Sequence, residues 1–316
     1  MNVGDLSLER FATRLAKEGV AIRWGPFVSH IVSKLPELAA PIHLLYADFP
    51  IEPPGSICDF HICARPRSLR LPWSGSQAEV LLDGAPLMPP YPRRWALPMF
   101  EWGLNACVYR SAHQFLIIHG AVVERSGCAL ILPGLPGAGK STLCAALVTG
   151  GWRLLSDELT LLSPADGLVQ PLARPISLKN DSIEIIRRLA PDWTFGPTAI
   201  DTHKGAVAHL RPPTESSRRN KEPACPRWIV TPQFAPGRPL QLSPTSKGST
   251  FISLGENSLN YEILGETGFR TMVRLIDRCD CYRLEHASAG EAVRALEDLV
   301  RGLPAEGRHA AVSSWS

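Results

Sequence analysis

The stretch that decides the fold is Leu130-Ile-Leu-Pro-Gly-Leu-Pro-Gly-Ala-Gly-Lys-Ser-Thr-Leu143. It begins as an apolar strand, and Gly134–Ser141 then fits the pattern G-x-x-x-x-G-K-[ST] at every fixed position. Glycines in such a loop let consecutive backbone amides point inward around phosphate oxygens. A helix expected at Ser141–Thr149 adds the partial positive charge of its N-terminus. The motif therefore predicts a loop that binds the phosphates of a nucleotide.

The residues of this loop have different expected roles. Lys140 supplies a point charge to the β and γ phosphates, and the Ser141 hydroxyl is an expected ligand of Mg²⁺. The residues expected to contact the nucleotide here are Gly134, Pro136, Gly137, Ala138, Gly139, Lys140, Ser141 and Thr142. The loop alone does not distinguish a kinase from an ATPase or a GTPase. A GTPase needs a base-recognising NKxD element, and Asn220-Lys-Glu-Pro223 lacks its final acid.

Apolar segments on both sides of the loop predict an α/β sheet. Phe115–Val123 is a continuous apolar run interrupted only by His119-Gly120. After the helix, Trp152–Leu155 and Leu159–Leu162 are expected strands. Strand, loop, helix and strand at this density are typical of the α/β class.

An acidic pair, Asp157-Glu158, follows the strand at Trp152–Leu155. The carboxyl ends of strands are where α/β sheets place their chemistry, so this pair and Lys140 are expected at one site. Of two neighbouring carboxylates, one can hold Mg²⁺ while the other accepts a proton from an attacking hydroxyl. We expect Asp157 to be catalytic and both acids to be candidate metal ligands, without deciding which does which. The alternatives are an acid in a turn without a role in catalysis and a metal ligand of an ATPase.

Length and composition suggest how the chain is organised. Its 316 residues allow one large domain or two smaller ones. We expect a mixed α+β N-terminal lobe at 1–110, a P-loop domain at 111–303 and a disordered tail at 304–316. In the lobe we expect two helices, at Leu6–Lys17 and Leu97–Cys107, and three strands, at Ile22–Phe27, Ile42–Phe49 and Asp59–Ala64. Farther on we expect a helix capped by Asn180 or Asp181 that runs to Ala190, and helices at Phe269–Arg278 and Gly290–Leu303. Strands are expected at Trp228–Thr231 and Tyr282–Leu284.

Charge and cysteine content exclude several classes of protein. The formal net charge is +3, which argues against a dedicated nucleic-acid binder. The longest apolar stretches are far shorter than the roughly 20 residues that a membrane-spanning helix needs. The N-terminus lacks the apolar region of a signal peptide, and several of the eight cysteines lie in apolar runs, as free buried thiols do. These features predict a cytoplasmic, reduced protein without a membrane partner.

The motifs in combination resemble the catalytic core of HPr kinase/phosphorylase. The residues that carry the likeness are "IIHGAVV" at 117–123, "LILPGLPGAGKSTL" at 130–143 and "GWRLLSDEL" at 151–159. The chain is closer to the HPr-kinase-related kinase A group, to which "EWGLNACV" at 101–108, "RPISLKNDSI" at 174–183, "KGAVAHLRPP" at 204–213 and "NYEILGETGF" at 260–269 are similar. The resemblance covers roughly residues 20 to 300.

The resemblance implies a P-loop kinase core of the HPr kinase and phosphoenolpyruvate carboxykinase type. It implies transfer of the ATP γ-phosphoryl group to a serine hydroxyl on a small protein or a ribosomal peptide, and it suggests a homo-oligomer. By match, His119 takes the place of the active-site histidine and Asp157 that of the acid that activates the serine. Without the resemblance, His119 would be interpreted as a satisfied core residue.

Two departures limit what the resemblance implies. The second acid is Glu158 where HPr kinases have Asp, and the segment 174–180 replaces their Glu-Ile-Arg-Gly signature. We therefore predict neither HPr as the substrate nor a reverse phosphorylase activity. Two alternatives stay open: a small-molecule (metabolic) kinase that uses the same loop and acid, and a nucleotide-gated binding module.

The basic middle segment offers further charges for the transferred phosphoryl group. Lys204 and Arg211 are the expected nucleotide contacts, and Arg174 and Lys179 are weaker candidates. Gly205 next to Lys204 would let a loop close over the nucleotide, because glycine permits hinge torsions. The alternatives are a solvated basic loop and a docking site for an acidic peptide.

Overall fold

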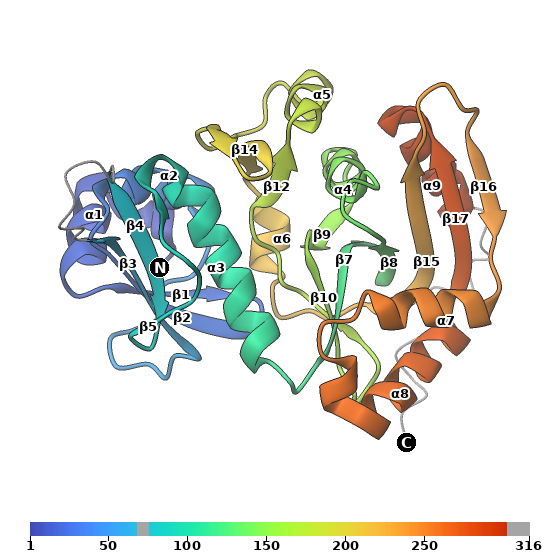
Figure 1. The fold of residues 1–316 in the computed structure, drawn as a ribbon, viewed down its shortest axis with the longest axis horizontal. Helices are drawn as coiled ribbons and strands as arrows, with labels where there is room; N and C mark the ends of the chain where they lie inside the picture. The colour runs from blue at the N-terminus through green and yellow to red at the C-terminus, as the bar shows by residue number, and fades with distance from the viewer. Residues whose placement is uncertain (68–75, 302–316) are drawn as a thin grey trace. The chain divides into compact units, whose positions relative to one another are not determined.

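The chain forms two compact units in a computed structural model that describes residues 1–67 and 76–301 (Figure 1). The first unit comprises Met1–Ala112 and Ala173–Asn220, and the second comprises His113–Leu172 and the described residues from Lys221 onward. The chain first passes from the first unit to the second between Ala112 and His113, next to the expected boundary at residue 110. The expected domain at 111–303 differs from this division, because 173–220 cluster with the N-terminal residues. The expected tail at 304–316 lies outside the described residues.

The second unit is built on an eight-stranded mixed sheet with the order β11-β10-β7-β8-β15-β17-β16, in which β9 also pairs with β7. The strands are β7 (Leu116–Arg125), β8 (Cys128–Pro133), β9 (Arg153–Ser156), β10 (Leu159–Leu162), β11 (Val169–Gln170), β15 (Cys225–Phe234), β16 (Gln241–Pro244) and β17 (Asp280–His286). β15 is parallel to both β8 and β17. β9 and β10 run in the same direction as β8, because all three are antiparallel to β7. The carboxyl ends of β8, β9, β15 and β17 therefore point the same way.

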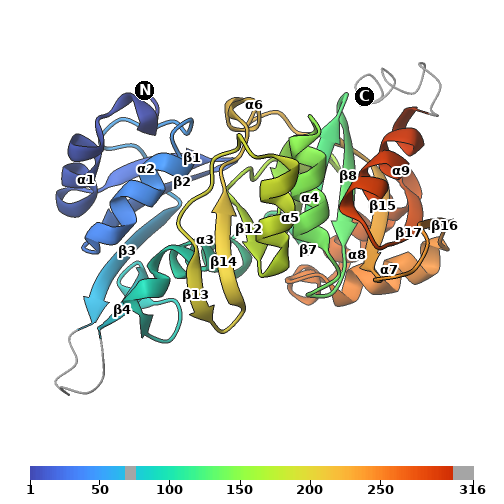
Figure 2. The same ribbon diagram turned by 90° about the horizontal axis from the view of Figure 1, so that it is seen from above.

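Four helices cover this sheet. They are α4 (Lys140–Thr149), α7 (Lys247–Glu256), α8 (Tyr261–Arg278) and α9 (Ala289–Arg301). α4 packs against β7, β8, β9 and α9, while α8 packs against β7, β15 and α7 (Figure 2). One buried cluster joins Ile118 and Ile131 of the sheet to Leu254 of α7 and Leu275 of α8. The predicted α/β class is thus confirmed as a mixed α/β fold.

The first unit contains two sheets. A six-stranded sheet has the order β1-β2-β3-β4-β5, with β6 on β4, and a three-stranded sheet has the order β12-β14-β13. These strands are β1 (Val20–Trp24), β2 (Phe27–Ser33), β3 (Phe60–Arg67), β4 (Gln77–Leu82), β5 (Ala85–Pro86), β6 (Tyr91–Pro92), β12 (Ile176–Lys179), β13 (Ala199–Thr202) and β14 (Gly205–Leu210). The helices are α1 (Leu8–Lys17), α2 (Ala39–Leu45), α3 (Ala96–Ser111), α5 (Asp181–Leu189) and α6 (Thr214–Arg218). Short 3-10 turns lie at Val3–Asp5, Pro36–Leu38 and Arg93–Trp95.

Most expected elements are present, and two differ. The single strand expected at Ile22–Phe27 is interrupted, because β1 ends at Trp24 and β2 begins at Phe27 after a turn. The segment Ile42–Phe49, expected as a strand, begins in helix α2 and ends in the turn that follows it. Ala39, Ile42 and Leu45 are its buried residues, and their spacing of three is that of one helix face. The apolar content of this stretch is therefore explained by a helix packed against the core rather than by a buried strand.

Two findings concern the cysteines and the helices. All eight cysteines are free thiols. Among the described helices, none combines the length and the apolar character that crossing a membrane requires.

Candidate functional site

The loop between β8 and α4 has a backbone that only glycine adopts easily. Gly134, Gly137 and Gly139 have φ angles of 140°, 86° and 88°. Gly139 is the residue that caps the N-terminus of α4, and its left-handed conformation turns the chain into the helix. A Cβ atom built at Gly137 would meet no atom within 4 Å, so the backbone there is open to a ligand. This loop and the start of a ten-residue helix provide the amide groups that an anion needs.

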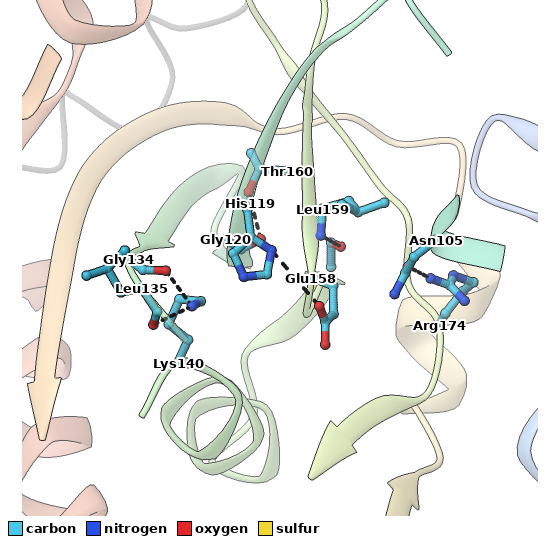
Figure 3. A network of polar contacts seen from close by, with 11 residues as sticks. Asn105, His119, Gly120, Gly134, Leu135, Lys140, Glu158, Leu159, Thr160 and Arg174 are labelled. Carbon is cyan, nitrogen blue, oxygen red and sulfur yellow. Dashed lines mark hydrogen bonds and ion pairs between the residues drawn. The ribbon is translucent and has the colours of Figure 1, made fainter. Parts of the chain in front are cut away.

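Lys140 is the first residue of α4 and lies over the loop (Figure 3). Its buried ammonium donates hydrogen bonds to the backbone oxygens of Gly134, at 2.5 Å, and of Leu135, at 3.0 Å. Ser141 and Thr142 follow in the first turn of the helix and are partly exposed. The expected phosphate-binding residues thus share one loop and one helix start.

The acidic pair lies between two strands that both pair with β7. Asp157 and Glu158 separate β9 from β10, and both strands pair antiparallel with β7. The pairs next to the acids, Ser156 with Val122 and Leu159 with His119, share one register, and the register of β9 shifts between Val122 and Val123. The Gly120 amide donates to the Glu158 backbone oxygen at 3.1 Å, and the Thr160 hydroxyl donates to the Gly120 oxygen at 3.1 Å (Figure 3). The backbone of the pair is therefore fixed to β7, the strand that also pairs with β8 ahead of the phosphate loop.

Asp157 lies close to the helix that follows the loop. It is only 6% exposed. Burial raises the pKa of the Cys144 thiol in α4 well above its usual value, and the nearby Asp157 charge raises it further. A carboxylate that acts on Cys144 is close to the first turn of α4, where Lys140 and Ser141 lie. The structure therefore brings Asp157 toward the predicted phosphate site.

His119 approaches the other acid. Its Nδ1 atom lies 4.0 Å from Glu158 Oε2, and its backbone amide donates to the Asn257 oxygen at 2.8 Å. In the view of Figure 3, the imidazole lies between the Lys140 and Glu158 side chains. The distance to Glu158 is too long for a direct hydrogen bond but is that of an ion pair when the imidazole is protonated. His119 is thus a partly exposed residue of the site rather than a buried core residue.

Gly120 is required next to His119 by close packing. A Cβ atom at this position would lie 3.0 Å from the Leu132 oxygen and 3.1 Å from Pro133 Cα. Both contacts are with backbone atoms at the end of β8. Moving that backbone to make room for a side chain would lower the stability of the fold. The glycine thus lets β7 lie tightly against the strand that carries the phosphate loop.

The other predicted contacts, Lys204 and Arg211, belong to the first unit. Lys204 lies in the turn between β13 and β14, and its ammonium is 4.5 Å from the centroid of the Trp102 ring. Arg211 Nη2 lies 2.6 Å from Asp48 Oδ2 in a partly buried ion pair. Their contacts with a nucleotide stay predictions.

Arg174, a weaker candidate, has a well-defined structural environment in the first unit. Its Nη1 donates to Glu101 Oε2 at 2.9 Å, its Nη2 donates to the Asn105 side chain, and its guanidinium lies 4.9 Å from the Trp24 ring centroid. The Tyr46 hydroxyl donates to the other Glu101 oxygen at 2.8 Å. Burial raises the pKa of Glu101, against the lowering effect of Arg174. These contacts explain Arg174 as one half of a buried ion pair.

Two residues beside the loop were not singled out in the sequence. Phe234 ends β15 and His286 ends β17, and both lie close to Gly139. Neither belongs to a recognisable motif. Only the order of strands in the sheet, which local sequence patterns do not specify, brings them to the phosphate loop.

The residues present fit a magnesium–nucleotide complex. Within 1–67 and 76–301, no three histidine, cysteine or acidic side chains form a group that could hold a metal by themselves. Mg²⁺ in nucleotide sites needs only one or two carboxylates together with the phosphates. Ser141 and the pair Asp157 and Glu158 supply oxygen ligands of that kind.

Comparison with protein-family models and with curated proteins finds no match for this chain.

Proposed function

We propose that this chain is an ATP-dependent kinase that transfers the γ-phosphoryl group to a serine hydroxyl of a small protein or a ribosomal peptide. The observation that carries the proposal is the position of two features at one edge of a sheet. The glycine loop with Lys140 follows β8, and Asp157 follows β9, which runs in the same direction. A phosphate site and a candidate base at the carboxyl ends of two strands that both pair with β7 are the parts that phosphoryl transfer requires.

The loop and Lys140 bind and orient the triphosphate in this proposal. The Lys140 ammonium now contacts two backbone oxygens of the loop, so it is close enough to contact phosphate oxygens placed in the same loop. Its charge, together with the amides at the start of α4, offsets the negative charge of the transferred group. Ser141 and one of the two acids would hold Mg²⁺, which when bound neutralises phosphate charge.

Asp157 acts as the base that accepts the proton of the serine hydroxyl. Its position near α4 supports this role, since the hydroxyl must approach the γ-phosphate from beyond Lys140. The serine oxygen bonds to phosphorus as the bond to ADP breaks, and the proton is left on Asp157. Glu158 positions His119 and balances its charge. A reaction of this kind in the cytoplasm is consistent with eight free thiols.

The experiment that tests the proposal compares Lys140→Ala with wild type and with Lys247→Ala. Lys247 is an exposed lysine of α7 whose ammonium donates to the Asp277 backbone oxygen, so it serves as a matched control. Binding of MgATP, measured by calorimetry, and transfer of labelled phosphate to host peptides are the two readouts. Lys140→Ala should weaken binding and abolish transfer, and Lys247→Ala should change neither. Normal turnover by Lys140→Ala would show the phosphate-loop assignment to be wrong.

A further inference from the structure

Two aromatic side chains contact the phosphate loop on the side away from the acidic pair. Phe234 and His286 are directly paired residues at the carboxyl ends of the parallel strands β15 and β17. Their ring centroids are 5.8 Å apart, with an edge-on angle of 63°. A Cβ atom built at Gly139 would lie 3.5 Å from Phe234 Cβ and 3.8 Å from His286 Nε2. Both residues therefore lie against the last glycine of the loop.

The two rings differ in exposure in a way that suits a ligand. Phe234 is 47% exposed, whereas His286 is 2% exposed. Among the residues that the structure describes, neither ring nitrogen of His286 has a hydrogen-bond partner at normal geometry. Burial lowers the pKa of His286, against weaker raising effects of the Ser288 backbone and of the Glu291 charge. Unsatisfied buried nitrogens are costly, and here one of them faces the loop.

The strand order gives the direction in which a nucleotide must extend. The acidic pair lies between β9 and β10, which pair with β7 on one side of β8, and β15 and β17 lie at the other side. If the terminal phosphate faces Asp157, as the proposed function requires, the nucleoside end of the molecule points away from it. That direction leads over Gly139 toward Phe234 and His286.

We propose that Phe234 and His286 form the nucleoside-binding end of the site, with the base stacked on the Phe234 ring and the His286 Nε2 atom hydrogen-bonded to the nucleoside. This inference rests on the proposed function and extends it to the part of the nucleotide that does not react. An exposed aromatic ring offers an apolar face to any base, and stacking of a base on such a ring contributes strongly to affinity. A neutral imidazole can donate or accept the hydrogen bond.

The test separates the nucleoside from the phosphates by comparing two ligands. Binding of MgATP and of magnesium tripolyphosphate, which has no nucleoside, is measured by calorimetry on the full chain. Phe234→Ala should weaken MgATP binding about ten-fold or more and leave tripolyphosphate binding unchanged, and His286→Asn should act in the same direction. Phe269→Ala is the matched control, because Phe269 is 51% exposed on α8 and contacts Phe251 instead of the loop.

A second variant keeps the test decisive if the alanine variant is poorly folded. Phe234→Leu retains an apolar side chain beside Gly139 but has no ring. It should therefore also bind MgATP more weakly, while its affinity for tripolyphosphate stays that of wild type. Equal loss of both ligands, or no loss of either, in a variant with wild-type thermal unfolding would overturn the inference. If tripolyphosphate binding depends on Lys140 while Phe234 has no selective effect, only this inference fails. If wild type binds neither ligand, the proposed function fails with it.

Discussion

His119 Nδ1 and Glu158 Oε2 lie 4.0 Å apart, although the two residues belong to different segments of the sheet. The Gly120 amide donates to the Glu158 backbone oxygen at 3.1 Å, so Glu158 lies beside His119, the residue that precedes Gly120. A carboxylate at this distance restricts the orientation of the imidazole. We therefore regard His119 and Glu158 as one functional pair.

The first prediction concerns the coupling within this pair. His119→Asn and Glu158→Gln should each lower kcat, and the double variant should be little slower than the slower single variant. The reason is that removing either partner already removes the interaction. The measurement is a double-mutant cycle on kcat, with thermal unfolding of each variant as the control for folding. Losses that simply multiply would show that the two side chains act independently.

The second prediction separates base from metal ligand at Asp157. Asp157→Asn should bind MgATP nearly as well as wild type but lower turnover by a factor on the order of 10² to 10⁴, the usual range for a general base. Asp298→Asn, at an exposed position of α9, is the matched control and should leave both unchanged. Calorimetry and steady-state kinetics give the two values. Loss of MgATP binding in Asp157→Asn would make Asp157 a metal ligand instead.

The third prediction tests the packing of Gly120. Gly120→Ala should lower the free energy of unfolding by about 1–3 kcal/mol, because the added methyl group meets backbone atoms 3.0 Å and 3.1 Å away. Gly248→Ala in α7 is the control, since a Cβ atom there meets nothing within 4 Å. In that helix, alanine should be neutral or slightly stabilising. Denaturant unfolding measures both, and an unchanged stability of Gly120→Ala would contradict the close-packing explanation.

The fourth prediction concerns the buried ion pair of Glu101 and Arg174. Glu101→Gln leaves the buried guanidinium without its counter-charge, which should cost about 3–5 kcal/mol of unfolding free energy. The matched pair in the same unit is Glu37 and Arg93, at 2.7 Å and more exposed. Glu37→Gln should cost about 1 kcal/mol or less. Equal losses for the two variants, measured by denaturant unfolding, would argue that burial adds nothing to the Glu101 interaction.

The parts of the site that the sequence predicts are those within one short segment. The glycines of the loop, Lys140 and Ser141 lie within eight residues, and their spacing alone requires a turn into a helix. Asp157 and Glu158 follow one helix and one strand later, so their position at a strand end was also predictable. The proposed role of His119 depends on a family resemblance, and the structure adds its contact with Glu158.

Features that depend on distant segments could not be predicted in this way. Phe234 and His286 reach the loop only because β15 and β17 follow β8 in the sheet, an order that no local pattern specifies. The assignment of 173–220 to the first unit likewise depends on contacts such as that of Arg174 with Glu101. The strand expected at Ile42–Phe49 was wrong because short apolar runs fit helix and strand equally well.

The most direct test of the central claim is transfer of labelled γ-phosphate from MgATP to a peptide or protein pool of the host by the purified chain. Asp157→Asn serves as the control that keeps nucleotide binding. We expect a labelled polypeptide with wild type and none with the variant, and the label should map to a serine. Nucleotide binding without label in any polypeptide would contradict a kinase of peptides or proteins.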